Sequence, residues 1–223
     1  MPWQGAAAGI VGVMSDAIAE LSSTSWERRK IEAMGRIQRV ALDLFDAHGY
    51  RNVTIERVAA AAEVSPSSVY RYFGTKEMLV LYDEADPKVL EAVRTAGGPQ
   101  TVAPAELIAV GRLLVPVLLE SLLTAEAEHR IRQRLQFIAA VPEIRAGQTK
   151  QMRELEDEFR TLVAERTGFG PNDLRVRMAA ATAVWGCVAA LDHWAGTGFA
   201  GRLKDIYAEA FGSIIDQVET MFR

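Results

Sequence analysis

The chain has 223 residues, of which 49% are hydrophobic and 24% are charged. This composition is that of a globular protein and excludes a disordered chain, and the length allows one large domain or two modest ones. The formal net charge of −4 argues against a protein that coats nucleic acid through bulk positive charge.

Charge is unevenly spread along the chain. Residues 26–80 hold nine Lys and Arg against seven Asp and Glu, whereas the rest of the chain holds 16 against 22. A mildly basic segment attached to an acidic remainder indicates that only one end of the protein meets an anionic partner.

Cysteine content and hydropathy bear on the location of the protein. The single cysteine, Cys187, cannot form an intramolecular disulfide, which suits a reducing cytoplasm. The early apolar run GAAAGIVGVM is too short to cross a bilayer, and Asp16 and Glu20 follow it. We therefore expect a cytoplasmic protein with no membrane partner. Residues 1–25 are interpreted as a flexible leader, or alternatively as a helical extension that packs on a partner or reaches DNA.

Helical periodicity dominates and strand patterns are almost absent, so we predict an all-α fold. The stretch WERRKIEAMGRIQRVALDLFDAHGY carries apolar residues at three-four spacing, and Gly49 ends its helix. Thr54 can cap a second helix, IERVAAAAE. Ser65, followed by a proline, caps a third short helix that ends at Gly74, and Thr75 is expected to cap a fourth that begins KEMLVLY.

Longer helices follow Pro87. We place them at about 87–96, 104–125, 127–140, 143–167, 172–195 and 202–222. The chain is thus divided into a leader at 1–25, an N-terminal domain of short helices at 26–80 and a C-terminal helical bundle at 81–223.

The second and third helices together form a helix-turn-helix unit. In such a unit the second helix lies in the major groove of DNA, and small residues of the first helix, here Ala59–Ala62, allow close packing. Val69 and Phe73 are expected to anchor the inner face. Hydroxyl, ring and guanidinium groups that suit phosphates and base edges occupy the outer face, at Ser67, Ser68, Tyr70, Arg71 and Tyr72.

Residues from about 34 to 80 resemble the DNA-binding domain of the tetracycline-repressor (TetR) family. The matching pieces are ALDLFDAHGYRNVTIERVAAAAEVS and VYRYFGTKEML, in order and at the family's spacing. Glu63 departs from the pattern, because the family commonly has Gly in this turn, where left-handed backbone costs Gly less than Glu. The resemblance implies that Thr54 caps its helix close to a phosphate and that Lys76 clamps a phosphate. It implies a recognition surface of Ser65, Ser67, Ser68, Tyr70 and Tyr72.

These residues also have plainer interpretations. Tyr70 and Tyr72 could serve only as amphipathic packing residues, and Arg71 could be a solvated side chain. The basic residues at 28–30 precede the first predicted helix and could form an arm in the minor groove, or only a solvated charge run.

An isolated recognition helix binds weakly, whereas two of them held about 34–36 Å apart by a dimer bind a palindrome well. We expect the last two helices to form a four-helix interface in a homodimer, as the family resemblance also implies. Small residues that permit close approach and an apolar stripe are the candidates: Ala179, Ala183, Gly186, Ala190, Ile206, Phe211, Ile214, Ile215 and Val218.

The resemblance further implies a ligand pocket in the C-terminal domain, from which a bound effector changes the spacing of the two DNA-binding parts. The Leu and Val content of residues 107–123 favours an apolar or amphipathic ligand. Pocket candidates combine ring surface or charge with a polar group, although each could serve only in packing or on a solvated helix face: His129, Arg132, Phe137, Phe159, Trp185, His193 and Trp194.

We therefore predict a dimeric transcriptional repressor that binds a double-stranded DNA operator and is released by an unknown small-molecule effector. No cofactor, metal site or catalytic residue is expected, because one cysteine and three scattered histidines offer no ligand cluster and no phosphate-binding glycine loop is present. The alternatives are a helix-turn-helix adaptor or architectural protein without a ligand, and an all-helical enzyme.

Overall fold

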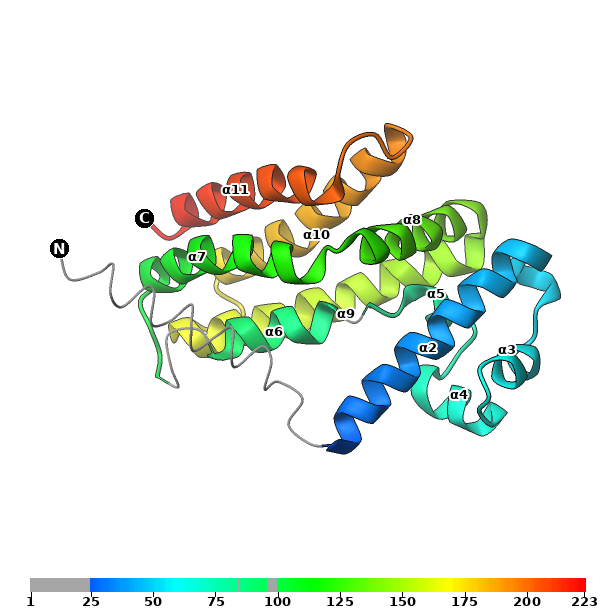
Figure 1. Ribbon diagram of the computed structural model, residues 1–223. Helices are drawn as coiled ribbons and strands as arrows, with labels where there is room; N and C mark the ends of the chain where they lie inside the picture. The colour runs from blue at the N-terminus through cyan, green and yellow to red at the C-terminus, as the bar shows by residue number, and fades with distance from the viewer. Residues whose placement is uncertain (1–24, 84, 96–99) are drawn as a thin grey trace. The chain divides into compact units, whose positions relative to one another are not determined.

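The structure, a computed structural model, describes residues 25–83, 85–95 and 100–223. These residues form helices and contain no strand, which confirms the predicted all-α class (Figure 1). The predicted leader lies, except for its last residue, outside the described residues. The elements are α2 (Ser25–His48), η1 (Tyr50–Asn52), α3 (Ile55–Ala61), α4 (Pro66–Phe73), α5 (Met78–Leu81), α6 (Ala85–Thr95), α7 (Pro104–Leu122), α8 (Ala125–Ala140), α9 (Pro142–Thr167), α10 (Leu174–Gly196) and α11 (Leu203–Met221).

The described residues divide into two compact units, which we call the head and the body. The head comprises residues 25–83 and 129–150, and the body comprises residues 85–95, 100–128 and 151–223. Helices α8 and α9 therefore each contribute residues to both units. Residues 129–150 were assigned from sequence to the C-terminal domain, because a helical pattern does not reveal which core its apolar face joins.

One hydrophobic core holds the head together. Ile37 and Phe45 of α2, Val58 of α3 and Val69 of α4 are almost fully buried in it, and so is Ile144 from α9. Complete burial of a large apolar side chain contributes about 1.5–3 kcal/mol of transfer free energy. The short helices of the head are thus stabilised by α2 and α9 rather than by their own length.

The predicted caps define the helix-turn-helix unit. The Thr54 hydroxyl accepts a hydrogen bond from the Arg57 N–H at 3.2 Å, and the Ser65 hydroxyl accepts one from the Ser68 N–H at 3.2 Å. The cap predicted at Thr75 is wrong, because α5 begins only at Met78 and no side chain caps it. The predicted start of the first helix is also late, since α2 includes the basic residues 28–30.

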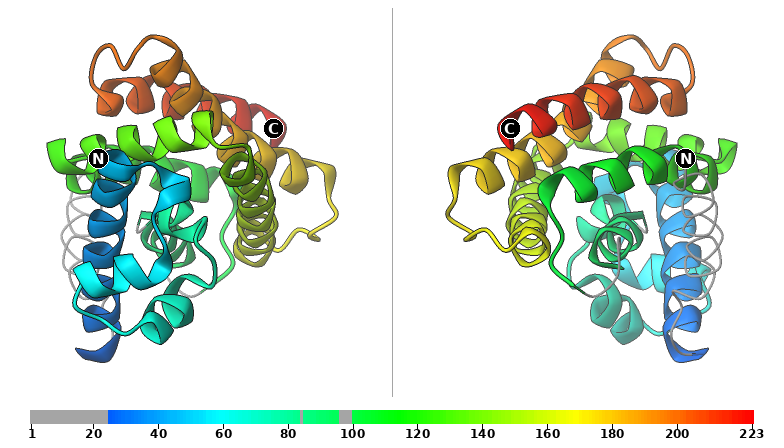
Figure 2. Two further views of the ribbon diagram at one scale, coloured as in Figure 1. Left: turned by 90° about the vertical axis from the view of Figure 1, so that its right-hand side faces the viewer. Right: turned by 90° about the vertical axis from the view of Figure 1, so that its left-hand side faces the viewer.

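In the body, α11 packs against both α7 and α10, and the three helices lie side by side in two views (Figures 1 and 2). A Cβ atom added to Gly186 of α10 would lie 2.7 Å from Cδ1 of Ile214 in α11. The glycine therefore permits a close approach of these helices within one chain.

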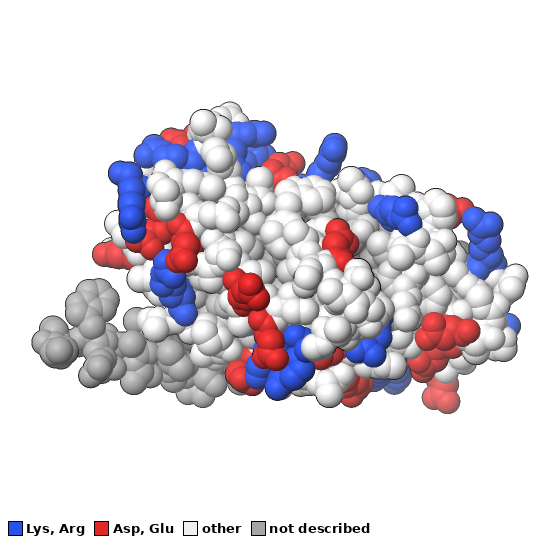
Figure 3. Space-filling model, turned by 90° about the horizontal axis from the view of Figure 1, so that it is seen from above, with Lys and Arg blue, Asp and Glu red and all other residues white. Residues whose placement is uncertain are grey.

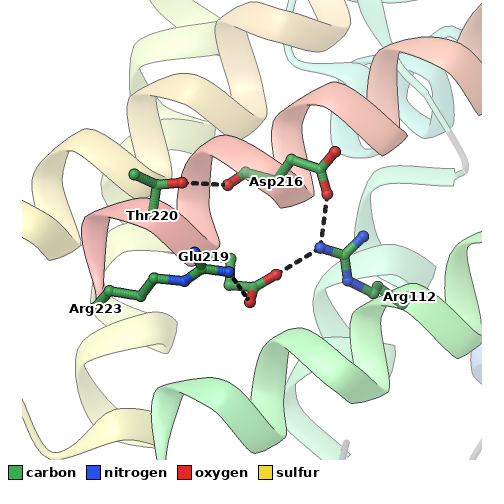
Figure 4. A network of polar contacts seen from close by, with 5 residues as sticks. All are labelled: Arg112, Asp216, Glu219, Thr220 and Arg223. Atoms are coloured by element: carbon green, nitrogen blue, oxygen red, sulfur yellow. Dashed lines mark hydrogen bonds and ion pairs between the residues drawn. The ribbon is translucent and has the colours of Figure 1, made fainter.

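Polar contacts also join α7 to α11. One guanidinium nitrogen of Arg112, Nη2, lies 2.7 Å from both Asp216 Oδ1 and Glu219 Oε2. Glu219 also accepts a hydrogen bond from Arg223 at 2.8 Å, and the Thr220 hydroxyl donates to the Asp216 carbonyl (Figure 4). These groups are partly exposed, so solvent screening limits their contribution to stability.

Among the described helices, α10 alone is by itself long and apolar enough to cross a membrane, and 28% of its most apolar window is buried in the chain. Core and interface helices of globular proteins can meet the same criterion. Leu174, Met178 and Trp185 are 70%, 46% and 36% exposed, and their spacing places them on one face of α10. The described residues leave this apolar face partly exposed.

The contacts of Asp173 at the start of α10 are expected to make the stability of the protein depend on pH. The Asp173 carboxylate accepts a hydrogen bond from the Arg175 N–H and forms two contacts with its guanidinium at 3.0 and 2.8 Å. These contacts lower the pKa of Asp173 from 3.8 to about 2. A carboxyl whose pKa is lower in the folded state stabilises it above the unfolded pKa, and this stabilisation is lost as the pH falls through the folded pKa.

Asp173→Asn is therefore expected to lower the urea midpoint at pH 5, and the difference from the wild type is expected to shrink between about pH 4 and pH 2. Asp205→Asn, at an exposed position in the first turn of α11, is the matched control. A difference that stays constant from pH 5 to pH 2 would contradict this account of the cap.

Candidate DNA-binding surface

Close packing of α3 on α4 sets the geometry of the helix-turn-helix unit. Ala59 and Ala62 are buried at the contact, whereas the alanines between them face solvent. The Val64 N–H donates to the Ala59 carbonyl at 2.9 Å, which closes the turn. Glu63 has a φ of 55°, so this residue adopts the left-handed backbone that Gly adopts at lower cost. The turn conformation thus forms despite the departure from Gly.

Two apolar residues fix the orientation of α4. Val69 is fully buried and Phe73 is 5% exposed, and both belong to the head core. The Phe73 ring meets the Tyr82 ring edge to face, with centroids 5.8 Å apart. The opposite face of α4 is therefore turned to solvent.

Polar groups gather at the N-terminal end of that solvent face. The Ser65 hydroxyl lies 2.9 Å from the hydroxyls of both Ser67 and Ser68. Ser65 and Ser67 are exposed, and Ser68 is half-buried. The free N–H groups of a helix N-terminus attract anions, so three hydroxyls at this end provide donors and acceptors for a phosphate or a base edge.

The two tyrosines of α4 differ in exposure and in contacts. Tyr70 is 49% exposed, whereas Tyr72 is half-buried against the head core. The Arg71 guanidinium lies 5.0 Å from the centroid of the Tyr72 ring and donates to its hydroxyl at 3.3 Å. Tyr72 thus supports an exposed Arg71, and Tyr70 presents its own ring and hydroxyl to solvent.

Lys76 is held inside the head in this structure. Its ammonium donates to the Tyr50 carbonyl and lies 4.2 Å from the Tyr50 ring centroid and 5.6 Å from that of Phe45. Burial lowers the pKa of Lys76, and the neighbouring Glu77 opposes that shift. A phosphate contact would have to share the ammonium with Tyr50, and the clamp role stays a prediction. Thr54, the other predicted phosphate neighbour, is exposed.

The pocket candidates are divided between the two units. His129 and Arg132 are exposed on the head, and the Phe137 ring lies 5.8 Å from Phe45 in the head core. Of the four in the body, Trp194 is a packing residue: it is fully buried, its indole donates to the Gly201 carbonyl at 3.3 Å, and its ring meets Phe199. Phe159 packs against a buried cluster of Val163, Ala164 and Val176. His193 is exposed, and the Trp185 indole donates to Glu156 at 2.8 Å.

Several interface candidates face the interior of the body instead of solvent. Ala179, Ala190 and Ile214 are buried, and Gly186 abuts Ile214. Gly186 and Ile214 therefore already pack on each other within one chain, and a contact of these four residues with a second chain stays a prediction. Partial burial of the other candidates leaves their role open: Ala183, Ile206, Phe211, Ile215 and Val218.

Sequence reasoning missed two polar residues of α8 that belong to the head. Gln133 is buried and donates to Asp46 at 2.7 Å, and Arg134 donates to the carbonyls of the last two residues of α5. Their place among charged neighbours in the run HRIRQRLQF gave no sign that they are covered. In the described part of the chain no group of three His, Cys, Asp or Glu side chains could hold a metal ion.

Comparisons with known proteins match the helix-turn-helix unit and a large part of the chain that follows it. Residues 37–82 match the family model described as bacterial regulatory proteins, tetR family, and residues 120–219 match the MftR C-terminal domain. The chain is 32% identical over 154 residues to the HTH-type transcriptional regulator TcmR of Streptomyces glaucescens, with 66% of each chain covered. It is 24% identical over 173 residues to MftR of Mycobacterium tuberculosis, covering 75% of this chain and 82% of that protein.

A solved structure shares the fold. NalD, the secondary repressor of the MexAB-OprM multidrug efflux pump in Pseudomonas aeruginosa, superposes with a TM-score of 0.50 at 17% identity, covering 83% of this chain and 94% of that chain. Together, the family models cover both the helix-turn-helix unit and most of the helices that follow it.

Proposed function

This chain belongs to the TetR family of bacterial transcriptional regulators, and from that premise we propose that it represses transcription by binding a palindromic operator as a homodimer. The observation that carries the proposal is the surface of α4. Its inner face is fixed by Val69 and Phe73, while Tyr70 and Arg71 are exposed on its outer face. Because the family models and the named relatives are those of regulators, the enzyme alternative is set aside.

On DNA, we assign separate roles to the two ends of the exposed surface. The serine hydroxyls at the start of α4 suit phosphates and base edges near the floor of the major groove. Arg71 can read guanine with two donors, and the Tyr70 ring can contact a thymine methyl. Sequence preference would therefore depend on Tyr70 and Arg71, and overall affinity on the serines and on Lys76 if its ammonium turns outward.

Tyr70→Ala is expected to weaken operator binding by about 1–3 kcal/mol, because an exposed ring and hydroxyl leave the interface. Fluorescence anisotropy on a labelled operator measures the effect. Tyr70→Phe is the matched control, since it removes only the hydroxyl and so separates a base contact through the ring from a phosphate contact. Unchanged affinity in Tyr70→Ala would remove Tyr70 from the site.

The exposed apolar face of α10 supports the homodimer. Leu174, Met178 and Trp185 lie on it. The surface seen from above Figure 1 has uncharged areas between its groups of charged side chains (Figure 3). An exposed apolar area of this kind is typical of a protein interface. We place the twofold contact on this face, instead of on the residues that α10 buries against α11.

We propose an apolar or amphipathic effector that binds the body and releases the operator. The apolar face of α7 supports this ligand class: Leu114 and Leu118 pack on Ala92 of α6, with Leu107 and Val110 beside them. An effector that binds the released form more tightly shifts the population away from DNA. The protein is proposed to act in the cytoplasm, where its operator is found.

A genomic pull-down with the purified protein tests this function. We expect one enriched palindrome close to a promoter, and loss of binding on addition of the organic-solvent extract of cells but not of the aqueous extract. Release by the aqueous extract alone would contradict the apolar effector. No enrichment at moderate salt by a folded dimer would contradict operator binding itself.

A further inference from the structure

Arg134, on the part of α8 that belongs to the head, binds the segment of residues 80–83, which comprises the last two residues of α5 and the two that follow it. Its Nε donates to the Val80 carbonyl at 2.7 Å, its Nη2 to the Leu81 carbonyl at 2.9 Å, and its Nη1 lies 2.7 Å from Asp83 Oδ2. The side chain is only 14% exposed. Charge-assisted hydrogen bonds shielded from solvent are among the stronger polar contacts in proteins, so Arg134 fixes this segment to α8.

A second side chain holds the same segment from another helix. Gln38 of α2 is 6% exposed, and its amide donates to the Tyr82 carbonyl at 2.7 Å. The carbonyls of Val80, Leu81 and Tyr82 are therefore bound by side chains of α2 and α8. Such a doubly bound segment has few alternative positions while both contacts persist.

The segment in turn contacts the recognition helix. The Tyr82 ring meets the Phe73 ring edge to face, with centroids 5.8 Å apart and planes at 90°. Phe73 is the last residue of α4 and is buried in the head core. A continuous set of contacts thus runs from Arg134, through the bound segment and Tyr82, to the inner side of α4.

We propose that Arg134 is a positioning residue for operator recognition. Through Tyr82 and Phe73 it holds α4 in the orientation in which α4 contacts the operator. The inference rests on the proposed operator binding. Residues 125–128 of the same helix, α8, belong to the body, so a change in the body that shifts α8 would disturb these contacts. Arg134 is therefore a point at which the state of the body can change the quality of DNA reading without any contact to DNA.

The first experiment compares Arg134→Ala with Gln136→Ala, which truncates a polar side chain at an exposed position on the same helix. Binding is measured to a set of palindromes whose half-site spacing differs in single base pairs. Arg134→Ala is expected to weaken binding to the best operator about tenfold or more. Its affinity is also expected to vary less with half-site spacing than that of the wild type. Affinity for a DNA fragment without the palindrome is expected to stay unchanged, and Gln136→Ala is expected to behave as the wild type.

Arg134→Lys gives a second variant in case the alanine variant does not fold. Lys keeps the charge beside Asp83 but lacks the planar fork that reaches both carbonyls. Its operator affinity is therefore expected to remain below that of the wild type. Full wild-type affinity and spacing preference in the lysine variant would overturn the positioning role.

A measurement without DNA separates this inference from the proposed function. The amide of Tyr82 donates to the Met78 carbonyl at 3.0 Å, and that of Gly74 donates to the Tyr70 carbonyl at 2.8 Å. Hydrogen exchange at both amides is expected to speed up in Arg134→Ala and not in Gln136→Ala. Unchanged exchange at Gly74 would overturn the inference even if the protein bound the operator. A wild-type protein that binds no palindrome would instead contradict the proposed function, and the exchange result would still test the role of Arg134.

Discussion

Replacing Phe73 by alanine is expected to lower the free energy of unfolding of the head by about 3–5 kcal/mol, the usual cost of truncating a buried aromatic ring. Phe73 is 5% exposed, belongs to the head core and meets the Tyr82 ring. Operator binding is expected to disappear as well, because the inner face of α4 loses its anchor. Urea unfolding followed by circular dichroism, together with anisotropy on the operator, measures both effects.

Tyr70→Ala is the matched control for this change, since it truncates an aromatic residue of the same helix at an exposed position. It is expected to leave the urea midpoint within about 0.5 kcal/mol of the wild type while it weakens DNA binding. If Phe73→Ala kept the wild-type unfolding curve, or if Tyr70→Ala unfolded the head, the assignment of inner and outer faces of α4 would be wrong.

Ile214→Asp is expected to unfold the body rather than to dissociate a dimer. Ile214 is 7% exposed, and its Cδ1 and Cγ1 lie 2.7 and 2.9 Å from the place where a Cβ of Gly186 would stand. A carboxylate buried there without a partner costs several kcal/mol. Loss of helical signal on heating, well below the wild-type midpoint, is the expected observation.

Met178→Asp tests the interface itself. Met178 is 46% exposed on the apolar face of α10, so an aspartate at this position stays hydrated in the monomer but opposes its copy across a twofold axis. Sedimentation is expected to give folded monomers for Met178→Asp at concentrations where the wild type is dimeric. Dimers of undiminished affinity in this variant would move the interface to another face.

Local patterns predicted the fold well because their causes are local. Thr54 and Ser65 cap helices through bonds to N–H groups three residues ahead, and Gly74, with a φ of 72°, ends α4. Val69 and Phe73 share one helical face by spacing alone, so their burial also followed. These features need no knowledge of distant contacts.

The features that could not be predicted from the sequence depend on contacts between residues that are far apart in the chain. The pattern of α10 and α11 showed that Gly186 and Ile214 are covered, but not whether their own chain or a second one covers them. Likewise, nothing around Arg134 indicated three partners at positions 80–83. The phosphate clamp expected at Lys76 stays a prediction, because its ammonium donates here to the carbonyl of Tyr50, 26 residues away in the chain.

The most direct test of the central claim, that α4 reads an operator from the major groove, is a methylation-protection footprint on the enriched fragment. The account predicts protection of guanine N7 atoms, which lie in the major groove, in two patches about one helical turn apart. Tyr70→Ala is expected to weaken both patches together. Protection confined to the minor groove, or one continuous stretch without twofold symmetry, would contradict operator reading by α4.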